Sequence, residues 1–281
     1  MLAASTGRTH TLRLAMAVCT ITQDAFFAAR AADVFQIFVD ARTHSQMSGG
    51  ERADIDARVG GRFSVFNGAV TGAFREIAAD RRLAMSWRDC DWQDDHFADL
   101  QLLFMPLSDG RGSHLQLTLA NVPEHKARQT ADAWREYYWV PIAEYLRDAA
   151  LRPARRFLLD FKNRANLDAV DETWAEQSTL HLGGADLGGG RGPQRSIGRM
   201  VFDAFADVRV EVEDQIVEGD RVVERHRATA VHLGEFMGIA ATGRQVSWTG
   251  NHIYRIANGR IAEAWSEVSL YELLSQLTGP A

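Results

Sequence analysis

The sequence from residue 254 to residue 265 reads YRIANGRIAEAW. The dipeptide Asn258-Gly259 stands between two runs rich in apolar residues, and it readily adopts the positive φ angles of a tight β-hairpin turn. Two further turn signals precede it, EGD at residues 218–220 and ATGR at residues 241–244. These signals divide residues 208–268 into four strands. We therefore predict an antiparallel sheet that ends in the hairpin around this turn.

The residues before these strands have helical patterns. Residues 157–178 place apolar side chains at helical spacing, and residues 193–205 do the same after Pro193, which is well suited to the first turn of a helix. Between them, residues 183–192 contain six glycines, so we expect a flexible loop there. Helices followed by such a meander predict a cone, in which the helices close one side of a bent sheet.

The first half of the chain predicts a second sheet with its own helices. We expect a strand at residues 18–22, a short helix at residues 28–39 and an antiparallel meander over residues 54–119, where glycine- and aspartate-rich turns recur. Residues 124–147 have one apolar helical face that can cover this sheet. A helix across a twisted sheet leaves a cavity between the two, and this cavity is the first candidate site.

Chain length and composition agree with two globular domains. The chain has 281 residues, of which 46% are hydrophobic and 24% charged. Four arginines and Pro153 mark a change of composition at residues 147–156. We expect an α+β protein with four segments: a disordered lead-in at 1–15, a first domain at 16–147, a linker at 148–156 and a second domain at 157–281.

Several classes of partner are disfavoured by the sequence. The net charge of -6 offers no basic surface for nucleic acid, and no apolar run is long enough to span a membrane. Cys19 and Cys90 lack the spacing of a disulfide framework or a zinc site, which fits a cytoplasmic location. The acidic residues around His96 are more typical of a solvated turn than of metal ligands. We expect no metal and no other cofactor.

The second half resembles the SnoaL-like polyketide cyclases from Phe161 to Leu277. The resemblance rests on Phe205-Ala206-Asp207, Val212-Glu213-Asp214, Glu218-Gly219-Asp220, Gly234-Glu235-Phe236-Met237-Gly238, the stretch from Tyr254 to Trp265, and Leu273-Leu274-Ser275-Gln276-Leu277. It implies the cone fold of nuclear-transport-factor-two-like proteins. For characterised relatives it also implies a cofactor-free aldol ring closure on a polyketide-type substrate.

The first half resembles the START-like (SRPBCC) superfamily from Val18 to Leu146, in the branch named after the heat-shock-protein ATPase activator. The motifs are Ala31-Ala32-Asp33-Val34-Phe35, Val59-Gly60-Gly61-Arg62-Phe63, Trp87-Arg88, Leu117-Thr118 and Tyr138-Trp139-Val140-Pro141-Ile142. This resemblance implies a helix-grip fold with a hydrophobic ligand between sheet and helix, and it assigns no activity.

Aldol chemistry needs one group that removes a proton next to a carbonyl and another that polarises or protonates the accepting oxygen. By resemblance, His181 and His252 stand at family histidine positions. His226 stands where the family has an aromatic residue, so packing and catalysis both remain open for it. The family acid after the last-strand tryptophan corresponds to Ser266. Strand alternation turns Glu267 away from Ser266, and a bulge would be needed to bring this carboxylate inward as a catalytic group.

Flat hydrophobic ligands favour aromatic walls. The expected ligand-binding residues are Phe236, Trp248, Tyr254, Trp265 and Ser266 in the second domain, and Trp87, Gln101, Tyr138 and Trp139 in the first. The sequence favours a cofactor-independent cyclase or isomerase acting on a hydrophobic, polyketide-type small molecule. A non-catalytic protein that sequesters a lipophilic metabolite, and a hydrolase or dehydratase on the same scaffold, remain alternatives. A homodimer is an expectation from the resemblances.

Overall fold

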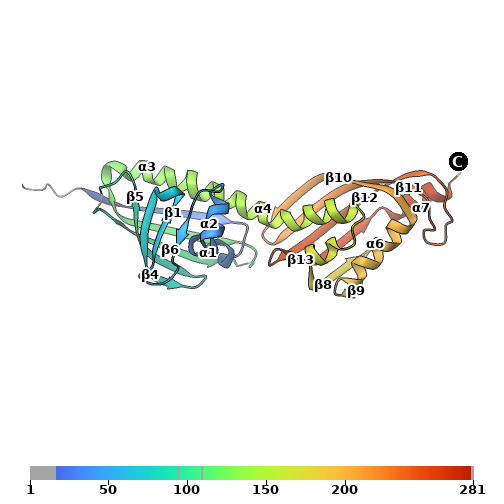
Figure 1. Cartoon of the computed structure of the whole chain (residues 1–281), viewed down its shortest axis with the longest axis horizontal. Helices are drawn as coiled ribbons and strands as arrows, with labels where there is room; N and C mark the ends of the chain where they lie inside the picture. The colour runs from blue at the N-terminus through green and yellow to red at the C-terminus, as the bar shows by residue number, and fades with distance from the viewer. Residues whose placement is uncertain (1–16, 94, 109, 280–281) are drawn as a thin grey trace, which may run out of the picture.

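The computed structural model describes residues 17–93, 95–108 and 110–279. The lead-in expected at residues 1–15 lies outside these ranges. Figure 1 shows two α+β domains placed end to end, each built on one sheet, which confirms the predicted fold class.

The first sheet has seven strands in the order β1-β7-β6-β5-β4-β3-β2, and each neighbouring pair is antiparallel. The strands are β1 (Val18–Phe27), β2 (Asp54–Ile55), β3 (Arg62–Val65), β4 (Val70–Ala78), β5 (Arg82–Asp89), β6 (Ala98–Pro106) and β7 (Ser113–Pro123). β1 is longer than the predicted strand because its whole length pairs with β7. The predicted meander is present.

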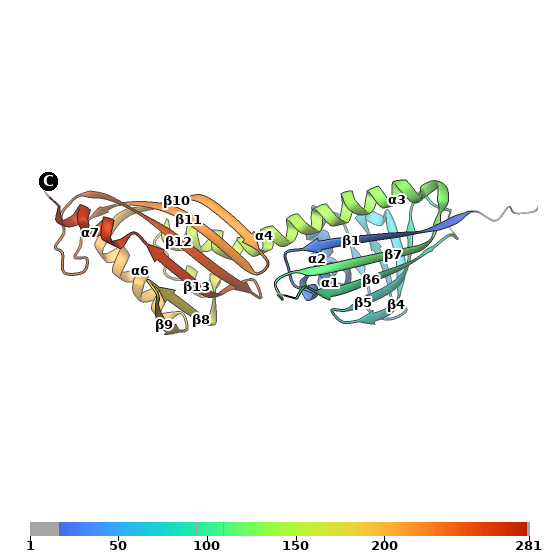
Figure 2. The same cartoon turned by 180° about the vertical axis from the view of Figure 1, so that it is seen from behind.

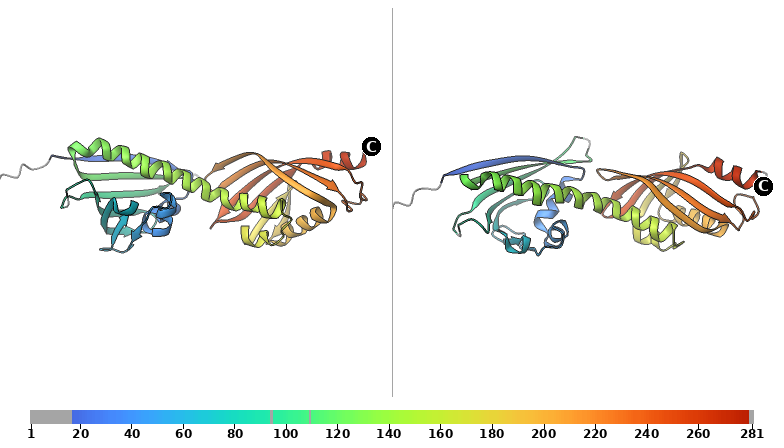
Figure 3. Two further views of the ribbon diagram at one scale, coloured as in Figure 1. Left: turned by 45° about the horizontal axis from the view of Figure 1, so that its top comes forward. Right: turned by 90° about the horizontal axis from the view of Figure 1, so that it is seen from above.

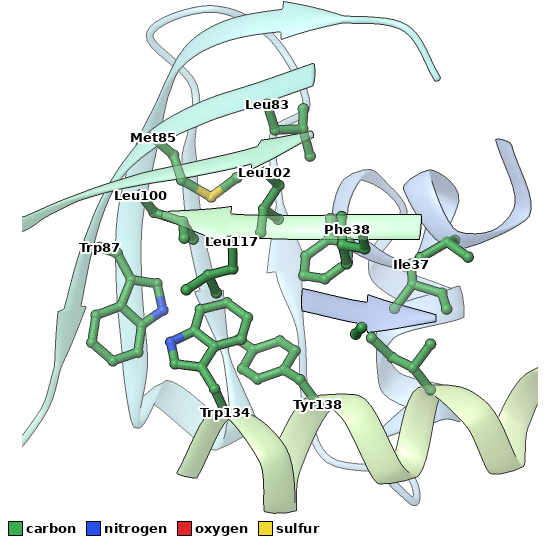
Figure 4. Close-up of a cluster of buried hydrophobic side chains, with 14 of the residues drawn as sticks. Ile37, Phe38, Leu83, Met85, Trp87, Leu100, Leu102, Leu117, Trp134 and Tyr138 are labelled. Atoms are coloured by element: carbon green, nitrogen blue, oxygen red, sulfur yellow. The ribbon is translucent and has the colours of Figure 1, made fainter. Parts of the chain in front are cut away.

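Helices cover one face of this sheet. The short helices are α1 (Ala31–Val39), α2 (Ala41–Met47), η1 (Phe66–Gly68) and η2 (Glu124–Lys126). The covering helix begins with α3 (Ala127–Trp134), passes through a π-helical turn, η3 (Arg135–Trp139), and continues as α4 (Val140–Arg156). Figure 4 shows Trp134 and Tyr138 of this helix pointing toward Trp87, Leu100 and Leu117 of the sheet.

The covering helix also connects the two domains. Residues 148–156, the expected linker, are helical, and α4 runs from the first sheet to the second (Figure 3). Leu151 and Ala154 of this segment are buried with the core of the second domain. Arginines on the exposed face of a helix explain the polar composition from which the linker was predicted.

The second sheet has six strands in the order β10-β11-β12-β13-β8-β9 (Figure 2). They are β8 (Trp174–Leu182), β9 (Ala185–Gly189), β10 (Phe205–Glu218), β11 (Arg221–His232), β12 (Gln245–Ala257) and β13 (Arg260–Val268). β10 to β13 are the four predicted strands, and the turn at Asn258-Gly259 joins the last two. β13 pairs in parallel with β8, and the other pairs are antiparallel.

Two predictions for residues 157–192 are wrong. The helix expected to reach residue 178 ends with the π-helical turn η4 (Phe157–Lys162) and the short α5 (Ala169–Thr173), because the chain from Trp174 pairs with β13. The glycine-rich segment is partly a strand, since β9 folds back on β8 around Gly183 and Gly184, which both have positive φ. In the first case, pairing with the distant β13 overrides local helical preference. In the second, a local hairpin forms within the glycine-rich segment.

Two helices close the inner face of the second sheet. α6 (Gly192–Ala204) begins next to Pro193, as predicted, and α7 (Leu270–Thr278) follows β13. The sheet bends around them, and their apolar faces meet the strands in clusters that include Phe205, Val246 and Leu273. None of the described helices is long and apolar enough to cross a membrane.

Candidate functional site

A cavity of about 300 Å³ lies inside the second domain, between the sheet and the helices η4, α6 and α7. Its wall is almost entirely apolar. Side chains from all three helices and from the sheet contribute to it: Phe161, Leu180, Leu182, Ile197, Met200, Val201, Phe202, Phe205, Val208, Val210, Phe236, Met237, Trp248, Val268, Leu270 and Leu273. A cavity of this size and composition suits a hydrophobic small molecule.

A group of polar side chains interrupts this wall. Lys162 Nζ lies 3.1 Å from His252 Nε2, and His252 Nδ1 lies 2.7 Å from Ser266 Oγ. These three residues and His226 line the cavity. The His226 ring stacks on the His252 ring, with centroids 4.7 Å apart. We call Lys162, Glu224, His226, His252 and Ser266 the polar cluster.

Glu224 completes the polar cluster from behind the cavity wall. Its side chain is fully buried, and its Oε1 lies 3.8 Å from Lys162 Nζ and 3.7 Å from His226 Nδ1. Both separations exceed a hydrogen bond. Its second oxygen accepts a hydrogen bond from Gln215 Nε2 at 3.1 Å. The carboxylate therefore acts on Lys162 through charge and not through a direct hydrogen bond.

Strand register brings the polar cluster together. Glu224 and His226 lie two residues apart on β11 and so share a face, while Glu224 pairs with His252 and His252 pairs with Ser266 across neighbouring strands. His226 pairs with Gly250, where a Cβ would lie only 2.7 Å from the imidazole. The glycine provides the space in which the His226 ring lies against His252.

Lys162 reaches this face from the last residue of η4. The next residue, Asn163, holds the end of the turn against β10, since its side chain accepts from the Val210 N–H at 2.6 Å and donates to the Val210 carbonyl at 3.2 Å. The lysine side chain is only 15% exposed, and its ammonium group lies 6.0 Å from the centre of the Phe157 ring. The lysine is thus held in a largely apolar environment.

Burial changes the protonation of the polar cluster. It lowers the pKa of Lys162 to about 8, against the opposing attraction of Glu224. Burial, together with repulsion from Lys162, lowers the pKa of His226 to about 3 and holds that of His252 well below its usual value. Both imidazoles are therefore neutral near pH 7, while Lys162 exchanges between its charged and neutral forms close to that pH.

These contacts define what His252 can do. When Lys162 is charged it donates to Nε2, so the ring proton is on Nδ1 and is donated to Ser266 Oγ. When the Lys162 amine turns away from Nε2, the lone pair of this nitrogen is free to take up a proton from a bound molecule and return it. The cavity thus has an apolar wall that carries one oriented acid–base group, His252, and one largely buried amine, that of Lys162.

The structure brings together some of the predicted site residues of the second domain. His252, His226, Ser266, Phe236 and Trp248 all line the cavity. Tyr254 lies behind His252, 98% buried, and packs against its ring with centroids 5.5 Å apart, so it belongs to the core and not to the cavity wall.

The other three predicted residues lie on the opposite face of the sheet. His181 Nε2 lies 3.1 Å from Glu263 Oε1, and the His181 ring stacks on Trp265, which also lies under the Arg221 guanidinium. Glu267 is exposed, because β13 continues in regular register from Ser266 and no bulge turns this carboxylate inward. His181, Trp265 and Glu267 therefore do not line the cavity.

Sequence reasoning missed Lys162 and Glu224. Glu224 stands two residues before His226 on a predicted strand, so alternation alone could have placed it on the same face. For Lys162 the available signal is composition. The chain has only two lysines, Lys126 and Lys162, among its 31 basic Lys and Arg residues.

A second cavity, of about 530 Å³, lies in the first domain between β5 and the covering helix. Trp87 and Tyr138 line it, as predicted, with Trp92 and Trp134. Carboxylates also border it, from Glu51, Asp89, Asp91, Asp132 and Glu136.

The two other residues predicted for this cavity lie elsewhere. Trp139 is buried and donates to Gln23 Oε1 at 2.6 Å, while Gln101 is exposed and accepts from Arg82 at 3.3 Å. No group of three or more metal-ligating side chains occurs within residues 17–93, 95–108 and 110–279.

Comparison with known proteins gives two family matches. Residues 152–277 match the model of the SnoaL-like polyketide cyclases, and residues 28–147 match that of the activator of Hsp90 ATPase homolog 1-like proteins. Both resemblances predicted from the sequence are confirmed.

Individual relatives cover parts of the chain. The mouse activator of 90 kDa heat shock protein ATPase homolog 1 is 29% identical over 132 residues, which are 45% of this chain and 36% of the relative. The chain therefore spans about a third of that protein's length. An HSP90 activator from Plasmodium falciparum is 24% identical, covering 45% of this chain and 95% of its own, with a TM-score of 0.42. TsrD from Streptomyces laurentii is 25% identical, covering 48% and 98%, with a TM-score of 0.43.

The chain thus joins a segment that matches the activator of Hsp90 ATPase homolog 1-like proteins to one that matches the SnoaL-like polyketide cyclases.

Proposed function

We propose that the second domain is a cofactor-independent enzyme that cyclises or isomerises a hydrophobic small molecule carrying carbonyl groups, of the polyketide type. One observation carries this proposal. A neutral imidazole, that of His252, is held between Lys162 and Ser266 at the wall of an otherwise apolar cavity. The match of residues 152–277 to polyketide cyclases supports the same class of reaction.

In the proposed reaction His252 removes a proton from the carbon next to a substrate carbonyl. The charge that develops on the carbonyl oxygen needs a hydrogen-bond donor or a cation close by. The Lys162 ammonium group lies beside His252, and in the proposed reaction it turns from His252 Nε2 to this oxygen, which frees Nε2 to take the proton. The apolar wall excludes water and so strengthens these electrostatic interactions. The carbanion then attacks a second carbonyl of the same molecule, and the proton held by His252 goes to the new alkoxide.

The first test measures proton removal without the natural substrate. The probe is α-tetralone, a bicyclic ketone with exchangeable protons next to its carbonyl. We expect the protein to accelerate exchange of these protons for deuterium in D₂O, followed by NMR, and His252→Asn to reduce the catalysed rate by at least about 100-fold. His125→Asn, at an exposed histidine of η2, serves as the matched control and should leave the rate unchanged.

The same samples separate catalysis from sequestration. A protein that only holds a lipophilic metabolite would bind the ketone without accelerating exchange of its protons. Binding would be seen as broadening of the ketone's NMR lines or as heat in calorimetry. Equal exchange rates for the native protein and His252→Asn would contradict the proposal.

A further inference from the structure

Lysine is rare in this protein, and one of its lysines lies in the cavity. Of the 31 basic Lys and Arg residues, 29 are arginines. Lys126, in the first domain, is half-buried and forms an ion pair with Asp91. Lys162 is the only lysine of the second domain, and it is the residue whose amine lies beside His252.

The contacts of Lys162 are poorly suited to a purely structural cation. A guanidinium presents five donors in a fixed plane and would bind a buried carboxylate through two hydrogen bonds. The Lys162 amine instead lies 3.8 Å from Glu224, beyond hydrogen-bond distance, and its hydrogen-bond partner is an imidazole. An imidazole can accept from an ammonium group or donate to a neutral amine, so this site accommodates both forms of the lysine.

From this geometry we infer that Lys162 is a nucleophile that forms a Schiff base with a ketone or aldehyde group of the bound molecule. The inference rests on the proposed function and refines it, since it makes the carbonyl activation covalent. A primary amine is the one group that lysine supplies and arginine does not, and amines desolvated in apolar pockets are suited to this reaction.

The reaction releases one water when the imine forms and consumes one water when the imine is hydrolysed, so Lys162 is regenerated. The Nζ lone pair of neutral Lys162 attacks the carbonyl carbon, and a proton passes from nitrogen to oxygen. One further proton, taken from solvent, lets the hydroxyl group leave as water, which gives a protonated imine. His252 then removes a proton from the adjacent carbon to give an enamine. The enamine carbon attacks a second carbonyl, and the new alkoxide takes the proton from His252. One water then returns to release the product and the neutral amine, and the proton taken up at the start goes back to solvent.

The surroundings of Lys162 fit each charge in this sequence. The protonated imine would lie near the buried Glu224 carboxylate, whose charge offsets it. The amine can lose its proton close to neutral pH because burial lowers the Lys162 pKa to about 8. The ionisable groups that face the amine are Glu224 and His226 from β11 and His252 from β12; on its own turn, Asp160 pairs with Arg156 and Arg164.

The test uses acetylacetone, a small 1,3-diketone that condenses with a reactive lysine to a stable, ultraviolet-absorbing enaminone with loss of one water. We expect one adduct per chain on the peptide that contains Lys162. Lys126 is the internal control and should react far more slowly at pH 7.5. The rate at Lys162 should rise about tenfold from pH 7 to pH 9 and then level off, as the neutral fraction approaches one, whereas an amine of ordinary pKa would continue to rise.

Two variants separate charge from nucleophilicity. Lys162→Arg keeps a cation and Lys162→Met keeps the length of the side chain, and both should abolish the adduct. If Lys162 acts covalently, Lys162→Arg should also lower α-tetralone exchange at least about 100-fold.

The outcomes distinguish this inference from the proposed function. The Schiff base is ruled out if acetylacetone leaves Lys162 unmodified in the native protein, or if Lys162→Arg retains full exchange activity. Exchange that still depends on His252 would then leave the acid–base proposal standing. If the native protein neither forms the acetylacetone adduct at Lys162 nor accelerates α-tetralone exchange, both proposals are wrong.

Discussion

Trp87, Trp134 and Tyr138 pack against one another inside the first domain with stacked and tilted rings, and carboxylates border the cavity that these rings line. In the second domain the cavity is lined by aliphatic and aromatic side chains, yet its wall includes a largely buried lysine and two buried histidines, and a buried glutamate lies behind it. Burying ionisable groups costs free energy, so a fold retains them where they have another use. The difference supports the proposal that the chemistry takes place in the second domain.

The largest expected effect tests the packing of the first domain. Trp134 is 1% exposed, and its ring stacks on that of Tyr138 with centroids 4.1 Å apart. We expect Trp134→Ala to lower the free energy of unfolding by about 3 to 5 kcal/mol, measured by urea denaturation followed by circular dichroism. Tyr137→Ala, on the same helix but 53% exposed, is the control and should cost less than about 1 kcal/mol. Equal effects at the two positions would contradict the assigned packing role.

The next effect tests the buried charges of the second domain. Glu224→Gln removes the carboxylate that faces Lys162, so we expect a loss of about 2 to 3 kcal/mol in unfolding free energy, limited because Lys162 can lose its proton. The pKa of Lys162 should fall further below 8, which would move the pH dependence of acetylacetone addition downward. Glu267→Gln changes an exposed carboxylate on the other face of the same sheet and should affect neither property. An unchanged pH profile in Glu224→Gln would show that this carboxylate does not act on the lysine.

The third effect compares the two domains in acid. Burial lowers the pKa of His44 in the first domain to about 4 and that of His226 to about 3, below an ordinary value near 6.5. The unfolded chain therefore binds more protons as the pH falls, and stability present above pH 6.5 is lost on acidification. Each histidine should lower the unfolding free energy by about 2 kcal/mol between pH 7 and pH 5. His252 lies in the second domain, so its protonation adds a further loss of stability to that domain and none to the first.

We expect the second domain to unfold at a higher pH than the first, and His226→Asn to narrow the gap. Amide hydrogen exchange resolved by peptide, at pH 7 and pH 5, measures the two domains separately. His44→Asn should reduce the acid sensitivity of the first domain alone. Faster opening of the first domain at pH 5 would contradict this order.

The architecture was predictable because its signals are local. The Asn258-Gly259 turn and strand alternation predicted the four strands, and alternation correctly placed Ser266 and Glu267 on opposite faces. His252 and Ser266 lie on the same face because they are direct partners across β12 and β13. Sheet register therefore carries most of the site information that the sequence contains.

The errors arise where distant contacts decide the structure. The sequence predicts a helix up to residue 178, yet residues 174–182 form β8. The register of β8 opposite β13 puts His181 on the outer face with Trp265. Lys162 reaches the cavity because η4 ends there and Asn163 bonds to Val210, 47 residues away. No periodicity within residues 157–178 reports that contact.

The smallest expected effect concerns the surfaces, where the two domains should behave alike. Arg156 pairs with Glu172 in the second domain and Arg58 with Asp56 in the first, and these side chains are 49 to 73% exposed. Exposed pairs contribute little because water and salt screen them. Arg156→Gln and Arg58→Gln should each change the unfolding free energy by less than about 1 kcal/mol. In 1 M NaCl each variant should be as stable as the native protein. A larger, salt-resistant loss at Arg156 alone would mean that surface charges, and not only the interiors, distinguish the domains.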